Sequence, residues 1–200
     1  DRVPGRMKQA FQRIEAHMTA SQIMVTGFAL AIFVGGILLS MPFCNADGHW
    51  LRFIDALFTA CSAVCVTGLV TIVPATQFTL AGKVILLILI QLGGLGIIAC
   101  TMGAFLILRK QITIRSRVMI QDSYDLHTMS GVVSMLRYVL HGTFALEGIG
   151  AVLYAIAFIP KYGVLRGLWY GVFHSVSAFC NAGIDILGED SLARYVTNPL

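Results

Sequence analysis

Two short apolar segments contain the residues best suited to chemistry, and the chemistry would come from their backbone. They are "SAVCVTGL" at residues 62–69 and "SAFCNAGI" at residues 177–184, and each has a glycine one position before its end. Glycine permits backbone angles that are closed to other residues. Carbonyl oxygens on an extended segment can replace the hydration shell of a cation. A tight turn in a packed bundle explains one such segment more simply, but two in register favour an ion site.

The two segments are related by a shift of 115 residues along the chain. Across the 15 positions from Asp55 to Leu69, five residues are identical to their shifted counterparts. The identical pairs are Phe58 and Phe173, Ser62 and Ser177, Ala63 and Ala178, Cys65 and Cys180, and Gly68 and Gly183. Because each segment also follows a long apolar run, we interpret the shift as an internal repeat, which in membrane proteins is typical of a transport pathway.

The elements that must position these segments are membrane spans. The hydrophobic fraction is 57% and the charged fraction 12%, and the mean hydropathy is +0.81. The charged share is about half that of a typical soluble domain. A helix needs roughly 20 apolar residues to cross a bilayer, and three runs meet that need, at about residues 21–43, 80–108 and 137–160. The net charge of +4 is too small to indicate a nucleic-acid surface.

Charge asymmetry sets the expected orientation. Basic residues gather in the N-terminal segment 1–20 and in and beside the loop 110–134, and such residues stay on the cytoplasmic side. Residues 51–69 and 165–184 then lie on the outer side, yet they are too apolar for exposed loops. We predict that each is re-entrant, with a short helix returning as extended chain. Non-helical backbone is tolerated at membrane depth only inside protein or beside a wet cavity. The expected fold class is an all-α integral membrane protein.

Three acidic residues could support an ion site. Glu147 lies within the third run, and an ionised acid at the bilayer centre costs about 2.5–3.5 kcal/mol, so it must face protein or water. We expect it to support the pore region; the alternative is a proton relay with His141, although a six-residue offset leaves the two about 120° apart on a helix. Asp55 and Asp185 flank the re-entrant segments and could attract cations at the outer mouth. Asp55 could equally be a favourable charge in a first helical turn.

Small residues and cysteines have simpler interpretations. "QLGGLG" at residues 91–96 lies inside an apolar run with no strand before it, so close helix packing explains it better than nucleotide binding. Cys61 and Cys65 lack a neighbouring histidine or acid cluster for a metal. We expect all five cysteines to behave as buried, small hydrophobic residues. No Ser/His/Asp or paired-Asp constellation appears, so we predict no catalytic residues and no enzyme activity.

Three stretches together resemble a known family. They are "DALFTACSAVCVTGL", "FTLAGKVILLILIQLGGLG" and "FHSVSAFCNAGIDIL". They are similar to the first two repeats of the Ktr/Trk/HKT potassium-transporter superfamily, and most similar to the membrane (pore) subunits of bacterial Ktr systems. The resemblance implies repeated span–pore helix–span units around a pseudo-fourfold ion pore. Residues 21–109 would form the first unit and residues 135–200 an incomplete second one, so we expect a fragment that lacks the remaining repeats.

The resemblance also implies a site and partners. The selectivity filter would bind K+ through backbone carbonyls of Cys65, Val66, Thr67, Gly68, Leu69, Cys180, Asn181, Ala182, Gly183 and Ile184. Na+ would be an alternative transported or coupling ion. The chain would need no cofactor of its own, because nucleotide would bind only a cytosolic regulatory ring that contacts a homodimer of membrane subunits. The expected location is the plasma membrane, in contact with lipid and not with nucleic acid. A proton-coupled cation carrier using Glu147 and His141 is the alternative function.

Overall fold

The described part of the chain is helical. A computed structural model describes residues 20–96, 99–100, 132–188 and 191–195. Its α-helices are α2 (Ala20–Ser40), α3 (Phe53–Val64), α4 (Pro74–Gln77), α5 (Leu80–Leu95), α8 (Val132–Tyr162) and α9 (Val164–Phe179), with 3-10 helices η1 (Pro42–Cys44) and η2 (Ser191–Tyr195). Within those ranges the only β pairing is an isolated bridge between Asn45 and Phe78. The expected all-α class is therefore confirmed for the described residues.

The first unit consists of α2, α3 and α5, which pack against one another. Small residues allow this close approach: a Cβ on Gly36 would lie 3.1 Å from the Leu57 Cα, and one on Gly35 would lie 3.4 Å from the Ala60 Cβ. At the start of α5, the Thr79 hydroxyl accepts a hydrogen bond from the Gly82 amide at 3.4 Å. This N-cap fixes where the chain leaves the loop and enters the helix.

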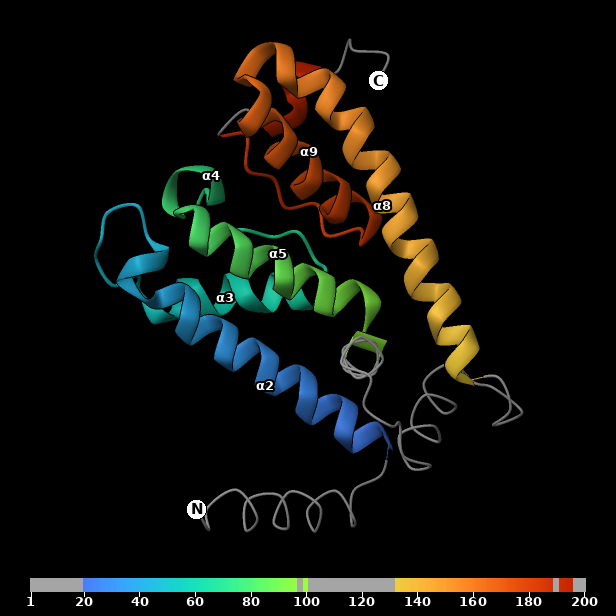
Figure 1. The fold of residues 1–200 in the computed structure, drawn as a ribbon. Helices are drawn as coiled ribbons and strands as arrows, with labels where there is room; N and C mark the ends of the chain where they lie inside the picture. The colour runs from blue at the N-terminus through green and yellow to red at the C-terminus, as the bar shows by residue number, and fades with distance from the viewer. Residues whose placement is uncertain (1–19, 97–98, 101–131, 189–190, 196–200) are drawn as a thin grey trace, which may run out of the picture.

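The second unit is a hairpin of α8 and α9 joined at Gly163, whose φ is +82° (Figure 1). A Cβ on Gly150 of α8 would lie 2.5 Å from the Ser175 hydroxyl of α9. Gly150 and Ser175 are the counterparts of Gly35 and Ala60 under the 115-residue shift. The repeat seen in the sequence therefore extends to a packing contact between the first and second helices of each unit.

Helix α5 joins the two units, because it contacts α2 and α3 on one side and α9 on the other (Figure 1). One buried cluster runs through both units and includes Leu39, Ala60, Ile90, Phe173 and Ile184. Helix α5 ends at Leu95, where Gly96 has a φ of +81°; residues 99–100 are helical again, and residues 101–108 of the predicted run lie outside the described residues. The N-terminal segment 1–19 and residues 101–131, with most of the predicted cytoplasmic loop, lie outside the described residues.

The described helices differ in whether they are long enough to cross a membrane. Among the described residues, Ser134–Tyr162 is the one helix long and apolar enough to cross a membrane. Met24–Ser40, Phe53–Val64 and Leu80–Leu95 are shorter apolar helices. Helix α3 has 12 residues, which gives it a length of about 18 Å. That is little more than half the thickness of a hydrocarbon core, and non-helical chain follows it.

Candidate ion site at the ends of α3 and α9

The two glycine-bearing segments leave their helices through the same hydrogen bonds. At the end of α3, the amides of Cys65, Val66 and Thr67 donate to the carbonyls of Cys61, Ala63 and Ser62 at 2.8, 3.4 and 3.0 Å. At the end of α9, the amides of Cys180, Asn181 and Ala182 donate to the carbonyls of Val176, Ala178 and Ser177 at 2.9, 3.0 and 2.7 Å. Every donor and acceptor is shifted by 115 residues. The repeated sequence thus folds into a repeated backbone geometry.

Left-handed backbone recurs at matching positions in the two segments. The φ angles are +57° at Val66 and +74° at Gly68, and +58° at Asn181 and +67° at Gly183. Asparagine tolerates this region, but a β-branched valine there is a genuine outlier. Such strain, about 1–3 kcal/mol for a residue, persists only where the surrounding structure enforces it, and it clusters at functional sites. Val66 therefore marks its segment as more than a connecting turn.

The tertiary structure brings the two segments into contact. A Cβ on Gly68 would lie 2.5 Å from the Ala182 carbonyl oxygen and 3.5 Å from the Gly183 Cα. Around Gly183 there is more space, since its Cβ would lie 3.9 Å from the Gly68 Cα. Glycine is thus required at position 68 for both its angle and its size, whereas at position 183 the angle alone requires it.

The double glycine of α5 lies at the ends of both short helices. A Cβ on Gly93 would overlap the Val64 carbonyl at the end of α3, and one on Gly94 would overlap the Cys180 side chain at the end of α9. This agrees with the prediction that "QLGGLG" serves close packing. Because α5 contacts both helix ends, it fixes two segments relative to each other, residues 65–69 and 180–184, which are the candidate filter segments.

Serine hydroxyls of the short helices hold the filter segments. In the first unit the Thr67 hydroxyl lies 3.0 Å from the Ser62 hydroxyl. In the second, the Ser177 hydroxyl donates to the Ile184 carbonyl at 2.6 Å. A carbonyl oxygen has two lone pairs, so this bond leaves the Ile184 carbonyl one lone pair for an ion.

Glu147 joins three helices beside the second filter segment. The residue is only 6% exposed, and its Oε1 accepts a hydrogen bond from Gln91 Nε2 of α5 at 2.8 Å. Its backbone carbonyl accepts the Ser175 hydroxyl of α9 at 2.6 Å. The Cys180 thiol lies 3.9 Å from Gln91 Oε1. A chain of contacts therefore runs from Glu147 through Gln91 to the first residue of the second filter segment.

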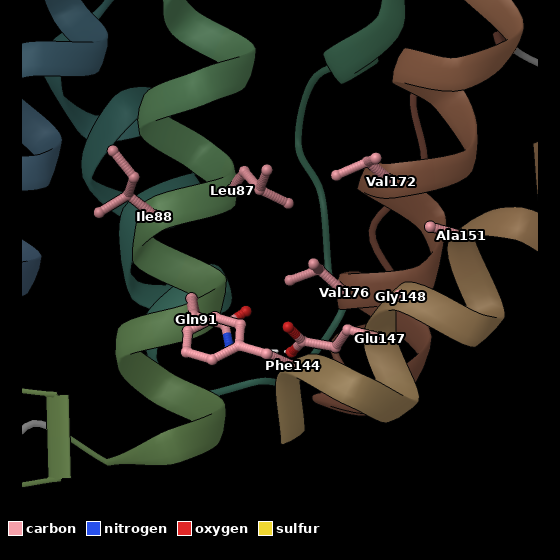
Figure 2. A pocket seen from close by; sticks show the side chains of 9 residues that line it. All are labelled: Leu87, Ile88, Gln91, Phe144, Glu147, Gly148, Ala151, Val172 and Val176. Atoms are coloured by element: carbon pink, nitrogen blue, oxygen red, sulfur yellow. Dashed lines mark hydrogen bonds between the residues drawn. The ribbon is translucent and has the colours of Figure 1, made fainter. Parts of the chain in front are cut away.

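Glu147 and Gln91 also line a cavity of about 380 Å³ between α5, α8 and α9, shown in Figure 2. The remaining lining residues are apolar: Leu87, Ile88, Phe144, Gly148, Ala151, Val172 and Val176. Gln91 is the functional candidate that the sequence reasoning missed. The sequence feature that could have indicated Gln91 is a lone amide side chain within an apolar run. Such groups form hydrogen bonds between helices in membranes.

The other predicted polar residues have local partners. His141 is exposed, and its Nδ1 lies 2.7 Å from the Arg137 carbonyl one turn earlier; the structure does not bring it to Glu147. Asp55 is half-buried in the first turn of α3 and lies 3.9 Å from the exposed Arg52 guanidinium, a contact near the surface that is of little energetic value. Asp185 Oδ1 accepts the Leu187 amide at 3.0 Å.

The expectation of five buried thiols was wrong for two of them. Cys44 and Cys180 are buried and Cys100 is half-buried, but Cys61 and Cys65 are exposed, with their sulfur atoms 3.9 Å apart. Burial raises the pKa of the Cys44 thiol, which keeps it protonated at neutral pH. Cys61 and Cys65 lie on the face of α3 that points away from α2 and α5, which sequence periodicity alone could not reveal.

The helices bring two glycine-bearing segments into contact, and comparison with known families shows to which class of protein the chain belongs. The chain belongs to the TrkH family, described as cation transport protein, which matches residues 6–200. The family is one of membrane transporters and not of enzymes. This confirms the family that the sequence resembles.

Individual relatives are similar over most of this chain. It is 41% identical over 182 residues to the potassium/sodium uptake protein NtpJ of Enterococcus hirae, covering 91% of this chain and 40% of that protein. It is 38% identical over 181 residues to the Ktr system potassium uptake protein B of Bacillus subtilis, covering 90% and 40%. With Ktr system potassium uptake protein D of Bacillus subtilis the identity is 34% over 189 residues, covering 93% and 42%. The chain thus spans about two fifths of the length of these relatives.

Proposed function

We propose that this chain provides two of the filter segments of a potassium uptake protein, and that K+ binds there through backbone carbonyls. The observation that carries the proposal is the pair of left-handed residues repeated at positions 66 and 68 and at positions 181 and 183. Carbonyls of a regular strand point alternately to two sides. Alternation of backbone handedness turns successive carbonyls toward one side, where they can replace water around a cation.

The electrostatics of the short helices support a cation at this place. Helices α3 and α9 both end at the filter segments, and the C-terminus of a helix carries a partial negative charge of about half an elementary charge. Asp55 and Asp185 would add negative charge at the outer mouth. The names of the relatives from Enterococcus hirae and Bacillus subtilis support K+ as the ion and Na+ as an alternative transported or coupling ion.

A ring of four span–pore helix–span units accounts for an uncovered face of α3. Ile54, Phe58, Cys61 and Cys65 form this face, and Ile54 is 68% and Phe58 40% exposed. Their counterparts on α9 are Trp169, Phe173, Val176 and Cys180, which are buried or half-buried in the cluster shared with α5. Because α5 covers this face on α9, a helix like α5 from another unit would cover it on α3.

The membrane setting follows from the apolar surface. Large apolar side chains are exposed along α8, among them Phe144, Leu146, Ile149, Val152 and Ile156. A helix that exposes several large apolar side chains is suited to contact with lipid. The multi-pass topology with a cytoplasmic N-terminus rests on the basic residues in segment 1–20 and in loop 110–134, by the positive-inside rule.

Glu147 has a supporting role in this proposal. It fastens α8 to α5 through its side chain and to α9 through its backbone, so it would hold the second pore helix in place. A proton relay to His141 has no support, because the histidine is exposed and bonded to its own helix.

The proposed partners are a second membrane subunit and a cytosolic ring that binds nucleotide. The names of the Ktr relatives support a multi-subunit system. Arg115 and Arg117 lie in the predicted cytoplasmic loop, outside the described residues. Charge reversal at both should weaken co-purification of the ring with the full-length protein, and full retention of the ring would count against this contact.

Uptake by a potassium-auxotrophic host tests the function. The full-length protein should restore growth at low external K+, and Na+ should compete only weakly. Absence of K+ uptake by a protein that is folded and inserted in the membrane would refute the proposal.

A further inference from the structure

Gln91 occupies the point where both units and the second filter segment meet. It lies in the last turns of α5, within three positions of Gly93 and Gly94, which contact the ends of α3 and α9. Its Nε2 donates to Glu147 Oε1 at 2.8 Å, and its Oε1 lies 3.9 Å from the Cys180 thiol. Figure 2 shows its side chain reaching from α5 toward Glu147 on α8.

The two neighbours of Gln91 make opposite demands on it. The Glu147 carboxylate needs a donor, since the described structure gives its side chain no other hydrogen-bond partner and the residue is 6% exposed. The Cys180 thiol is a weak donor, and it faces the amide oxygen of Gln91 at 3.9 Å. The amide side chain of glutamine offers a donor and an acceptor on one planar group without carrying a charge. When the amide nitrogen of Gln91 faces Glu147, the amide oxygen faces Cys180. Each contact therefore supports the amide orientation that the other contact requires.

We propose that Gln91 is a positioning residue for the second filter segment. Through its contacts with Glu147 and Cys180, Gln91 couples the position of α8 to the position of that segment. This inference rests on the proposed function, because Cys180 begins the segment whose carbonyls would select K+. Gln91 itself touches no ion. Its removal should change ion discrimination more than folding, because Gly94 and the apolar neighbours still hold α5 against α9.

A reciprocal exchange separates this role from simple packing. Gln91→Met keeps the length of the side chain but supplies no donor for Glu147. Gln91→Glu places two carboxyl groups against each other. The double variant Gln91→Glu/Glu147→Gln restores one amide and one carboxylate, with an acceptor still facing Cys180. Ile88→Leu is the matched control, because Ile88 lies one turn earlier on α5 and lines the same cavity without a polar contact.

The variants are made in the full-length protein, and uptake of K+ with Na+ as competitor is measured in the potassium-auxotrophic host. The parent tests the proposed function. We expect Gln91→Met to lower the K+ over Na+ preference by up to about tenfold, the limit reached if the whole energy of one hydrogen bond to a buried carboxylate is expressed in ion discrimination. Gln91→Glu should lower the K+ over Na+ preference further, and the preference of the double variant should return to within about threefold of the parent value. Ile88→Leu should match the parent.

Two results would overturn the role of Gln91 while leaving the proposed function intact. One is a parent-like ion preference in Gln91→Met. The other is a double variant that discriminates no better than Gln91→Glu although both are folded, as judged by thermal stability in detergent. If Gln91→Met does not fold, the comparison of Gln91→Glu with the double variant decides whether Gln91 has this role. A parent without K+ uptake refutes the proposed function itself.

Discussion

Gly68→Ala should damage the filter more than any other glycine substitution among the left-handed positions. Two costs combine at this residue. A side chain at φ +74° costs about 1–2 kcal/mol. The new Cβ would also lie 2.5 Å from the Ala182 carbonyl oxygen, so that carbonyl must move by about 1 Å to reach ordinary contact distance. Overpacking of this kind typically costs about 1–3 kcal/mol more.

Two other glycines separate these costs. Gly48 has a φ of +66° and no atom within 4 Å of a Cβ, and it lies in the loop before α3. Gly183 has a φ of +67°, and its Cβ would meet only the Gly68 Cα, at 3.9 Å. Gly48→Ala and Gly183→Ala should therefore each lose only about 1–2 kcal/mol of stability, from the left-handed angle. Gly68→Ala carries the same cost and displaces a carbonyl in addition.

The assay combines thermal unfolding of the full-length protein in detergent with K+ uptake in the presence of Na+. Gly68→Ala should lower the K+ over Na+ preference by at least about tenfold, because an ion site depends on carbonyl positions to within a fraction of an ångström. Gly48→Ala should leave that preference unchanged, and Gly183→Ala should lie between the two. Equal behaviour of Gly68→Ala and Gly48→Ala would refute the contact between the two filter segments.

Four further substitutions test how the helices and the filter segments pack. Gly94→Ala should destabilise the protein by about 1–3 kcal/mol through overlap with the side chain of Cys180, whereas Gly148→Ala, with no atom within 4 Å, should stabilise it by up to about 1 kcal/mol in thermal unfolding. Ser177→Ala should cost about 1 kcal/mol and reduce K+ preference by freeing the Ile184 carbonyl; an unchanged preference would argue against an anchoring role. Cys61→Trp should lower the yield of folded protein if another unit covers this face of α3, and normal yield on size exclusion would speak against the closed ring.

Much of the helical layout could be predicted from local sequence. The apolar runs and the charge asymmetry indicated helices near residues 21–43 and 137–160, and the glycines at 68 and 183 indicated special backbone. The end of α5 could not be placed, because the apolar run continues past Gly96 and hydropathy does not record a left-handed glycine. The exposure of Cys61 and Cys65 was also beyond reach, since α3 is apolar around most of its surface and its covered side depends on its neighbours.

The sequence by itself determined the family, the helical class and the repeat, because these depend on composition and on residues compared at a fixed offset. Only the tertiary structure decided which residues meet. The sequence marked Glu147 as needing a donor but could not name Gln91, which lies 56 positions away on another helix. It also treated Gly68 and Gly183 as equivalent. The structure distinguishes them, because the Ala182 carbonyl lies against Gly68 while Gly183 has space for a Cβ, and contact distances depend on how the two units pack.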